Sequence, residues 1–247
     1  FMENGQEADT KLKLNLVGRN PDDGVTSIAY DKGYFFLKYL EAYVGREKFD
    51  AFLKEYFARF AFTSNDTEAF LVYLNKNLFQ KNGLKPITDL SEWVYGTGLP
   101  ESMPKVHSTR FDAVDRALLK WEKGDLKFPT ETWSSQEWVH FIKNLPDEMD
   151  QKSMEQLDKK FDFTHSGNAE ILGAWYVHCS RHLYKTSFAP MEEFLVNTGR
   201  RKFLMPIYKQ LSATEKGKAL ALSIYKKARS NYHFVAINSL DKLLYSR

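Results

Sequence analysis

The sequence predicts an all-α protein, in which helices follow one another from about residue 27 almost to the end of the chain. Apolar and aromatic residues recur every three or four positions through this region, which is the spacing of one face of an α-helix. No strand-like alternation occurs after residue 110. With 247 residues, of which 43% are hydrophobic and 15% aromatic, the chain is long enough for one large domain or two smaller ones with real cores.

The first 24 residues differ from the rest of the chain, because they are polar and contain several glycines. Residues 11–16 alternate lysine or asparagine with leucine, and this short alternation could be a strand or an extended arm. Residues 20–24, Asn-Pro-Asp-Asp-Gly, predict a turn that leads into the first helix.

Two aromatic helices are expected next. The first carries Tyr30 on its first turn, runs to about Val44 and ends at Gly45, a residue suited to the left-handed conformation after a helix. The second carries an apolar stripe of 3.6-residue period from Phe49 to Phe60.

Two further helices complete this part of the chain. Asn65 and Glu68 resemble a capping box, in which two side chains bond to backbone amides at a helix start, and predict a third helix through Phe79. A short fourth helix is expected over about residues 89–95, ending at the Gly-Thr-Gly-Leu-Pro segment of residues 96–100.

A domain boundary is predicted at residues 100–109, which hold two prolines and no periodicity. We expect one domain over residues 1–99 and another over residues 110–247. In the second, helical patterns alternate with short polar breaks, and residues 134–137 and 212–215 both read as capping boxes. Paired helices of this length suggest a curved, solenoid-like stack of the HEAT or armadillo kind.

Tyr30 is the first candidate functional residue, and two interpretations are open on its spacing alone. A phenol on the first turn of an apolar helix can direct its hydroxyl into a cleft and donate to an oxyanion, while Gly33 lets another group pack close. The alternative is an ordinary core tyrosine whose hydroxyl bonds a carbonyl.

His178 and His182 lie one helical turn apart, the spacing that a helical zinc site requires. The zinc-peptidase motif needs a glutamate directly after the first histidine, and this position holds Cys179. A third ligand about 19 residues after the second histidine would fall on Arg201, and a cation does not bind zinc. We therefore interpret both histidines as structural or exposed, and predict no metal ligand in this chain.

Residues 199–203, Gly-Arg-Arg-Lys-Phe, are the second candidate site. Three cations follow a helix-ending glycine, close to the start of the next helix, where exposed amides and the helix dipole favour anions. Arg200 and Lys202, two positions apart, could converge on one carboxylate while Arg201 points elsewhere. The alternative is a solvated basic corner with no ligand. Pro206 would open or kink this helix.

Composition excludes several classes of function. The net charge is only +3 and the basic residues are scattered, so a nucleic-acid partner is not expected. No apolar run reaches the roughly 18 to 20 residues that span a bilayer. One cysteine excludes an internal disulfide framework, which fits a reducing compartment such as the cytoplasm without excluding export. The chain begins Phe-Met-Glu-Asn-Gly, as a piece of a longer protein would.

Taken together, three local signatures resemble one family. Ala-Tyr-Asp-Lys-Gly (residues 29–33), Glu92-Trp93 followed by Gly-Leu-Pro (98–100), and Gly-Arg-x-Lys-Phe (199–203) occur in the order found in the C-terminal half of the gluzincin aminopeptidases of the leukotriene A(4) hydrolase group. The similarity extends over about residues 10 to 245.

The resemblance implies a fold and a set of roles. Residues 1–99 would be the helical tail of a thermolysin-like catalytic domain, and residues 110–247 an α-helical C-terminal domain. Tyr30 would match the tyrosine that stabilises the tetrahedral oxyanion beside zinc. Arg200 would match the arginine that holds the substrate's C-terminal carboxylate, and Lys202 the lysine that assists it. Asp22 falls where the leukotriene hydrolase has an acidic residue in its substrate tunnel.

The sequence also departs from the family pattern. It contains no His-Glu-x-x-His motif and no stretch that binds the substrate's amino terminus. Residues 1–4 look similar to the end of that stretch, but they lie too close to Tyr30 and the likeness is interpreted as accidental. Val25 stands five residues before Tyr30, where the mammalian epoxide hydrolase has a second tyrosine, so peptide hydrolysis is the better interpretation.

Two hypotheses follow. In the first, the chain is the C-terminal fragment of a zinc aminopeptidase that removes N-terminal residues from short peptides. The zinc would be held by the missing N-terminal part of the catalytic domain, and a β domain would also be missing. No cofactor is expected in this fragment. In the second, the helical stack is an interaction scaffold without catalysis.

Overall fold

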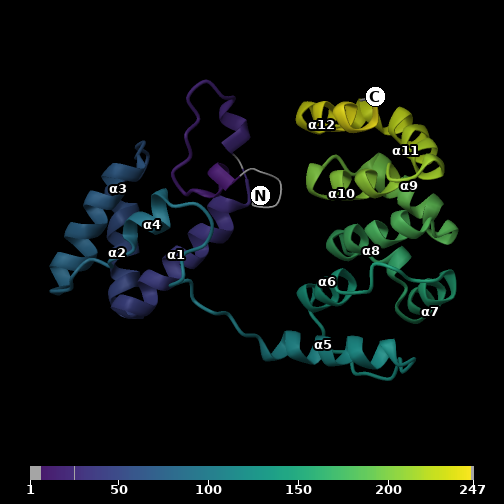
Figure 1. The fold of residues 1–247 in the computed structure, drawn as a ribbon, viewed down its shortest axis with the longest axis horizontal. Coiled ribbons are helices and arrows are strands. Elements are labelled where there is room, and N and C mark those ends of the chain that lie inside the picture. Colours follow the sequence, from purple (N-terminus) through teal and green to yellow (C-terminus); the bar gives the residue numbers. More distant parts are fainter. Residues whose placement is uncertain (1–6, 25, 246–247) are drawn as a thin grey trace. The chain divides into compact units, whose positions relative to one another are not determined.

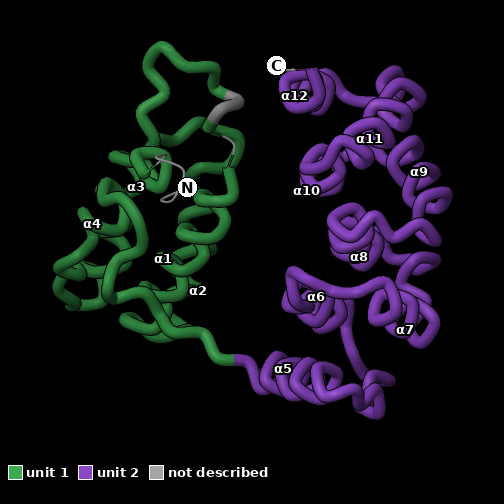
Figure 2. Tube along the Cα trace, turned by 45° about the vertical axis from the view of Figure 1, so that its right-hand side comes forward, with its two compact units in different colours: residues 1–107 green, residues 108–247 purple. Residues whose placement is uncertain are grey.

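The computed structural model describes residues 7–24 and 26–245, and its regular structure in these residues is entirely helical (Figure 1). The predicted all-α class is therefore confirmed. The chain divides into two compact units, residues 1–107 (unit 1) and residues 108–247 (unit 2) (Figure 2). Each unit has its own hydrophobic core.

The described residues of unit 1 form four α-helices joined by short 3₁₀ and π-helical turns. The α-helices are α1 (Ile28–Val44), α2 (Arg46–Arg59), α3 (Thr67–Leu74) and α4 (Leu90–Tyr95). The short turns are Glu7–Thr10, Pro21–Gly24, Gln80–Asn82 and the π-helical Asn75–Phe79. Residues 11–16 form an irregular arm rather than a strand, and the amide of Lys13 donates to the carbonyl of Val94 at 3.0 Å.

The ends of α1 follow the sequence prediction, whereas α3 differs at both ends. Gly45 closes α1 at φ 87°, a conformation that favours glycine. The N-cap of α3 is Asp66, whose side chain accepts from the amide of Ala69, so the predicted cap at Asn65 was wrong by one residue. The α-helix also stops at Leu74, and the chain continues to Phe79 as a π-helical turn.

The core of unit 1 lies along one stripe of α1. Phe36, Leu40 and Val44 are buried at i, i+4 and i+8, and the ring of Phe36 packs on Trp93 of α4 at 5.7 Å. Because only this stripe is covered by unit 1, the other apolar face of α1, which carries Tyr30, is left exposed.

Unit 2 is a stack of helices in two layers. Figure 1 shows α5 (Thr109–Glu122), α6 (Ser135–Lys143), α8 (Ala169–His182), α10 (Arg201–Leu211) and α12 (Phe234–Tyr245) following one another in one layer. The second layer holds α7 (Gln151–Phe161), α9 (Phe188–Asn197) and α11 (Glu215–Ala228). Each helix contacts mainly its neighbours, as in the solenoid-like stack that the sequence predicted.

The helices of unit 2 are capped by side chains at most of their starts. The predicted capping box of Ser134 and Glu137 is present at the start of α6. The second predicted box was wrong, because Thr214 rather than Ser212 caps α11 and accepts from the amide of Gly217. Ser212 instead donates to the carbonyl of Tyr208 at 2.7 Å, within the last turn of α10.

Candidate functional site

Tyr30 stands on the first turn of α1 with its side chain open to solvent. Its exposed fraction is 74%, and its hydroxyl has no hydrogen-bond partner among the described residues. The core-tyrosine alternative is therefore wrong for this chain. Tyr30 lines an open, largely apolar hollow of about 660 Å³ with Tyr34, Leu37 and Phe70. A phenol in this environment can donate its hydroxyl to a ligand.

Gly33 lies beside Tyr30 on the wall of the same hollow. A Cβ added at this glycine would come no closer than 3.9 Å to any neighbouring atom, the nearest being Cδ2 of Leu12. The packing of unit 1 would therefore accept a side chain at position 33. Because Gly33 has none, the space next to Tyr30 stays open.

A buried cation anchors the helix that carries Tyr30. Lys32 is only 1% exposed, and its Nζ donates to the carbonyl of Thr10 at 3.2 Å and to that of Gly96 at 2.8 Å. Burial lowers the pKa of this ammonium, since a charged group loses hydration there. The Thr10 hydroxyl in turn accepts from the amide of Gly98 at 2.7 Å. Lys32 thus ties α1 to two other segments of unit 1.

Two other residues of the sequence hypotheses lie close to α1 in the chain. Asp22 belongs to the 3₁₀ turn Pro21–Gly24, and the structure describes its backbone only. Val25 and residues 1–4 lie outside the described residues.

The second candidate site lies at the start of α10. Arg200 is the N-cap residue and makes no side-chain capping bond, and Arg201 and Lys202 form the first turn. The following residue, Phe203, is buried, and both cations lie against its ring: the Arg200 guanidinium carbon is 5.9 Å from the ring centroid and the Lys202 Nζ is 5.5 Å away. Both cations therefore contact the same aromatic ring, and their convergence on one carboxylate stays a prediction. Arg201 makes no ring contact or ion pair among the described residues.

Phe203 is held in place by close packing against α8. A Cβ added at Gly173 would lie 2.7 Å from Cδ1 of the Phe203 ring and 3.3 Å from Cε1, so only glycine leaves room for the ring in this position. The ring also packs edge-on against Phe194 of α9, with centroids 5.9 Å apart. The position of both cations therefore depends on a buried contact between neighbouring helices.

The two cations differ in their partners. The Lys202 Nζ lies 2.7 and 2.6 Å from the two carboxylate oxygens of Glu170, on the first turn of α8. Arg200 makes no ion pair with any described residue. Sequence reasoning missed Glu170, which is 32 positions from Lys202, and no local signal indicates that α8 and α10 start side by side.

Pro206 lies inside α10 rather than at its start. A proline in this position has no amide to donate to the carbonyl of Lys202, four residues earlier. The first turn of α10, which carries the cations, therefore has fewer backbone hydrogen bonds than the rest of the helix.

The two histidines of α8 form no metal site with other described residues. Their rings are stacked with centroids 6.4 Å apart, and within the described part of the chain no group of three or more histidine, cysteine, aspartate or glutamate side chains could hold a metal ion. His178 is buried, and this burial lowers its pKa to about 4, because the charged ring is poorly solvated there. Burial also lowers the pKa of His182. Both rings are therefore neutral at neutral pH.

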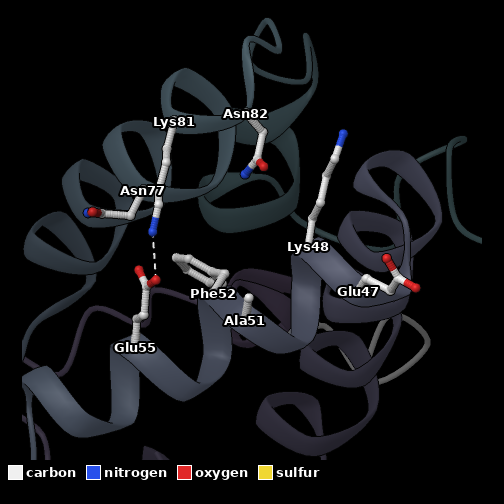
Figure 3. Close-up of a pocket in the computed structure, with 8 residues that line it drawn as sticks. All are labelled: Glu47, Lys48, Ala51, Phe52, Glu55, Asn77, Lys81 and Asn82. Carbon is white, nitrogen blue, oxygen red and sulfur yellow. Dashed lines mark hydrogen bonds and ion pairs between the residues drawn. The ribbon is translucent and has the colours of Figure 1, made fainter.

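A further hollow in unit 1 lies between α2 and the segment that follows α3 (Figure 3). Its lining mixes acidic and basic side chains, and Lys81 is paired with Glu55 at 2.6 Å. Since the charges compensate each other, this hollow does not favour one class of ligand.

The comparisons with known proteins match two neighbouring stretches of the chain. Residues 133–244 match the family model "Leukotriene A4 hydrolase, C-terminal", and residues 5–93 match the model "Peptidase family M1 domain". The chain is 28% identical over 248 aligned residues to a leucine aminopeptidase 2 of Ajellomyces capsulatus, covering 96% of this chain and 39% of that protein. It is 26% identical over 243 residues to a leukotriene A-4 hydrolase homolog of Botryotinia fuckeliana, covering 94% of this chain and 37% of that protein.

A solved structure of native yeast LTA4 hydrolase has the same fold over 97% of this chain and 43% of its own length, with a TM-score of 0.74 and 23% identity. One family model describes the C-terminal part of leukotriene A4 hydrolase, and the other describes the M1 peptidase domain. Two adjoining stretches of the chain thus match the leukotriene A4 hydrolase group of M1 peptidases. It spans about two fifths of the length of the relatives named above.

In the described part of the chain, no helix is both long enough and apolar enough to cross a lipid bilayer.

Proposed function

We propose that this chain is the C-terminal part of a zinc aminopeptidase that removes N-terminal residues from short peptides. The observation that carries the proposal is the pair of cations on Phe203, which places two positive charges beside one ring in a chain that both family models connect to peptidases. Residues 1–99 would be the end of the catalytic domain, and residues 110–247 the helical C-terminal domain. The remaining catalytic and β domains would precede them in the whole protein, and the substrate would be a short peptide.

Tyr30 would act on the reacting carbonyl. An attack on the scissile carbonyl places negative charge on its oxygen, and a phenol hydroxyl held at that point stabilises the charge by donating a hydrogen bond. The exposure of Tyr30 and its unpaired hydroxyl support this role. Lys32 would keep α1, and therefore the phenol, in register with the rest of unit 1.

Zinc is the metal of the family that this chain resembles. The described residues hold no group that fits a zinc ion, so we propose that the ligands lie in the preceding part of the protein. None of the residues named above would hold the metal.

Arg200 and Lys202 would bind the free carboxylate at the far end of a short peptide. Hydrogen bonds between charged partners contribute about 1.5 to 3 kcal/mol each, and a substrate held at both ends presents its scissile bond in one position. Asp22 would border the substrate path, as the resemblance implies. The buried, unpaired Cys179 is compatible with a cytoplasmic protein.

The test uses the whole enzyme with Arg200→Ala. We expect kcat/KM for a tripeptide to fall about 10- to 100-fold, the loss of one charge-assisted contact. An aminoacyl arylamide has no carboxylate, so its kcat/KM should change less than about threefold by the same reasoning. Equal losses on the two substrates would contradict the carboxylate assignment, and a whole protein without any aminopeptidase turnover would favour the scaffold hypothesis instead.

A further inference from the structure

The Lys202–Glu170 pair connects the first turns of two neighbouring helices beside the cationic site. Both oxygens of Glu170 contact the Lys202 ammonium, at 2.7 and 2.6 Å. Both side chains line one open hollow of unit 2, together with Phe111, His140 and Lys143. They are half-exposed, 54% for Lys202 and 42% for Glu170, so a ligand in this hollow can reach the ammonium.

We propose that Glu170 is a specificity-determining residue that competes with the substrate's carboxylate for Lys202. This inference rests on the proposed function, because it assumes that Lys202 binds peptide carboxylates. In the free protein the carboxylate of Glu170 contacts the same ammonium that a peptide carboxylate would contact. A peptide with a free C-terminus must then displace Glu170 or share the ammonium with it.

The geometry favours competition over a purely structural role. An ammonium has three protons and can contact two carboxylates, but two negative charges on one cation repel each other. Exposed ion pairs are weak, so Glu170 can be displaced and reduces the affinity for carboxylates without abolishing it. Arg200, which has no ion pair among the described residues, would remain available as the first anchor.

The ion pair is not needed to hold the two helices together. The starts of α8 and α10 are already joined by the buried contact between Gly173 and Phe203, and Leu204 and Ile207 of α10 are fully buried in the core. Removal of the charge on Glu170 should therefore change recognition rather than folding.

A matched control exists in the same unit. Lys227 of α11 pairs with Glu192 of α9 at 2.5 Å, with exposed fractions of 56% and 32%. This pair also joins neighbouring helices and is comparably exposed, but neither residue lines the hollow beside Lys202. Glu192→Gln therefore reports the effect of removing an equivalent ion pair away from the site.

The experiment compares Glu170→Gln with Glu192→Gln in the whole enzyme, using a tripeptide acid, its C-terminal amide and an aminoacyl arylamide. For Glu170→Gln we expect kcat/KM on the acid to rise about two- to fivefold at low salt, the effect of freeing one exposed cation, with the amide and the arylamide unchanged. The gain should shrink at high salt, since screening weakens exposed charge pairs. Glu192→Gln should leave all three substrates unchanged, and thermal melting should show both variants folded.

Three results would overturn the inference. The first is no gain on the acid, and the second is a loss, which would mean that Glu170 positions Lys202 instead of competing for it. The third is a gain that persists when Lys202→Met is also present. If Arg200→Ala affects the acid and the arylamide equally, the proposed function fails; if Arg200→Ala is selective and Glu170→Gln gives no gain, only this inference fails.

Discussion

Gly173→Ala tests whether the packing of Phe203 controls the cationic site. The added methyl group would lie 2.7 Å from Cδ1 of the Phe203 ring, closer than two non-bonded carbon atoms can approach, and 3.3 Å from Cε1, which is a tight contact. Phe203 is buried against Phe194, so the ring cannot turn away without moving the first turn of α10. Because Arg200 and Lys202 lie against this ring, their positions should change with it.

The expected stability change is a difference between two opposing effects. Overpacking in a core costs about 1 to 3 kcal/mol. Replacement of a helical glycine by alanine returns about 1 kcal/mol through a better helix propensity. We therefore expect a net loss of unfolding free energy of up to about 2 kcal/mol, measured by urea denaturation. For the whole enzyme we expect kcat/KM on a tripeptide acid to fall about 10-fold, the effect of weakening one charge-assisted contact, with the arylamide little changed.

A second variant separates crowding from loss of the site. Gly173→Ala combined with Phe203→Leu should recover stability, because the smaller side chain makes room for the methyl group, but it should not recover tripeptide hydrolysis, since the ring that contacts both cations is gone. If Gly173→Ala alone were more stable than the natural protein and hydrolysed the tripeptide normally, the Phe203 ring would have moved without cost. This result would contradict the prediction that the packing of Phe203 controls the cationic site.

Three other changes test separate parts of the structure. Tyr30→Phe in the whole enzyme should lower kcat about 100- to 1000-fold on tripeptide and arylamide alike, as expected for loss of an oxyanion donor, and an unchanged kcat would exclude that role. His178 has a folded pKa of about 4 against 6.5 for the unfolded chain, so its contribution to stability is complete above pH 6.5 and is lost as the pH falls toward 4. Urea denaturation should therefore show that the free energy of unfolding falls by about 3 kcal/mol over this pH range, and that the fall is smaller in His178→Gln. If the free energies of unfolding of the two proteins changed in parallel with pH, the role of His178 would be contradicted. Lys32→Met leaves the carbonyls of Thr10 and Gly96 without their donor. The substitution should lower the melting temperature by an amount that corresponds to a loss of about 1 to 3 kcal/mol in unfolding free energy. An unchanged melting temperature would show that these two hydrogen bonds do not stabilise the fold.

The extent of the helices was predictable where a local signal is unambiguous, as with Gly45 after α1 and the Ser134–Glu137 box before α6. Where several capping side chains follow one another, the sequence does not indicate which one the loop presents to the helix. This is why Asp66 and Thr214, rather than their neighbours, are the caps. The π-helical turn that follows Leu74 has no sequence signal of its own.

The candidate site was predictable only in part, for a different reason. α1 is apolar on more than one face, so its pattern predicts a helix but not which face the rest of unit 1 covers. The exposure of Tyr30 could be read only from the packing. Arg200 and Lys202 stand out because they are close in sequence, whereas Glu170 and Gly173 reach the same place from another helix.

Pro206 has a consequence for how α10 moves. The opening amides of an α-helix have no acceptor four residues earlier, and proline contributes no amide at all. Hydrogen exchange should therefore be fast at Arg201 and Lys202 and slower from Phe203 onward, because the amides of Phe203 and Leu204 donate to the carbonyl of Arg200 at 3.0 and 3.3 Å. A side-chain contact, the Phe203 ring on α8, then keeps the cationic first turn of this helix in place. Binding of a carboxylate there should then be visible as slower exchange in the first turn, with little change in the remainder of the helix.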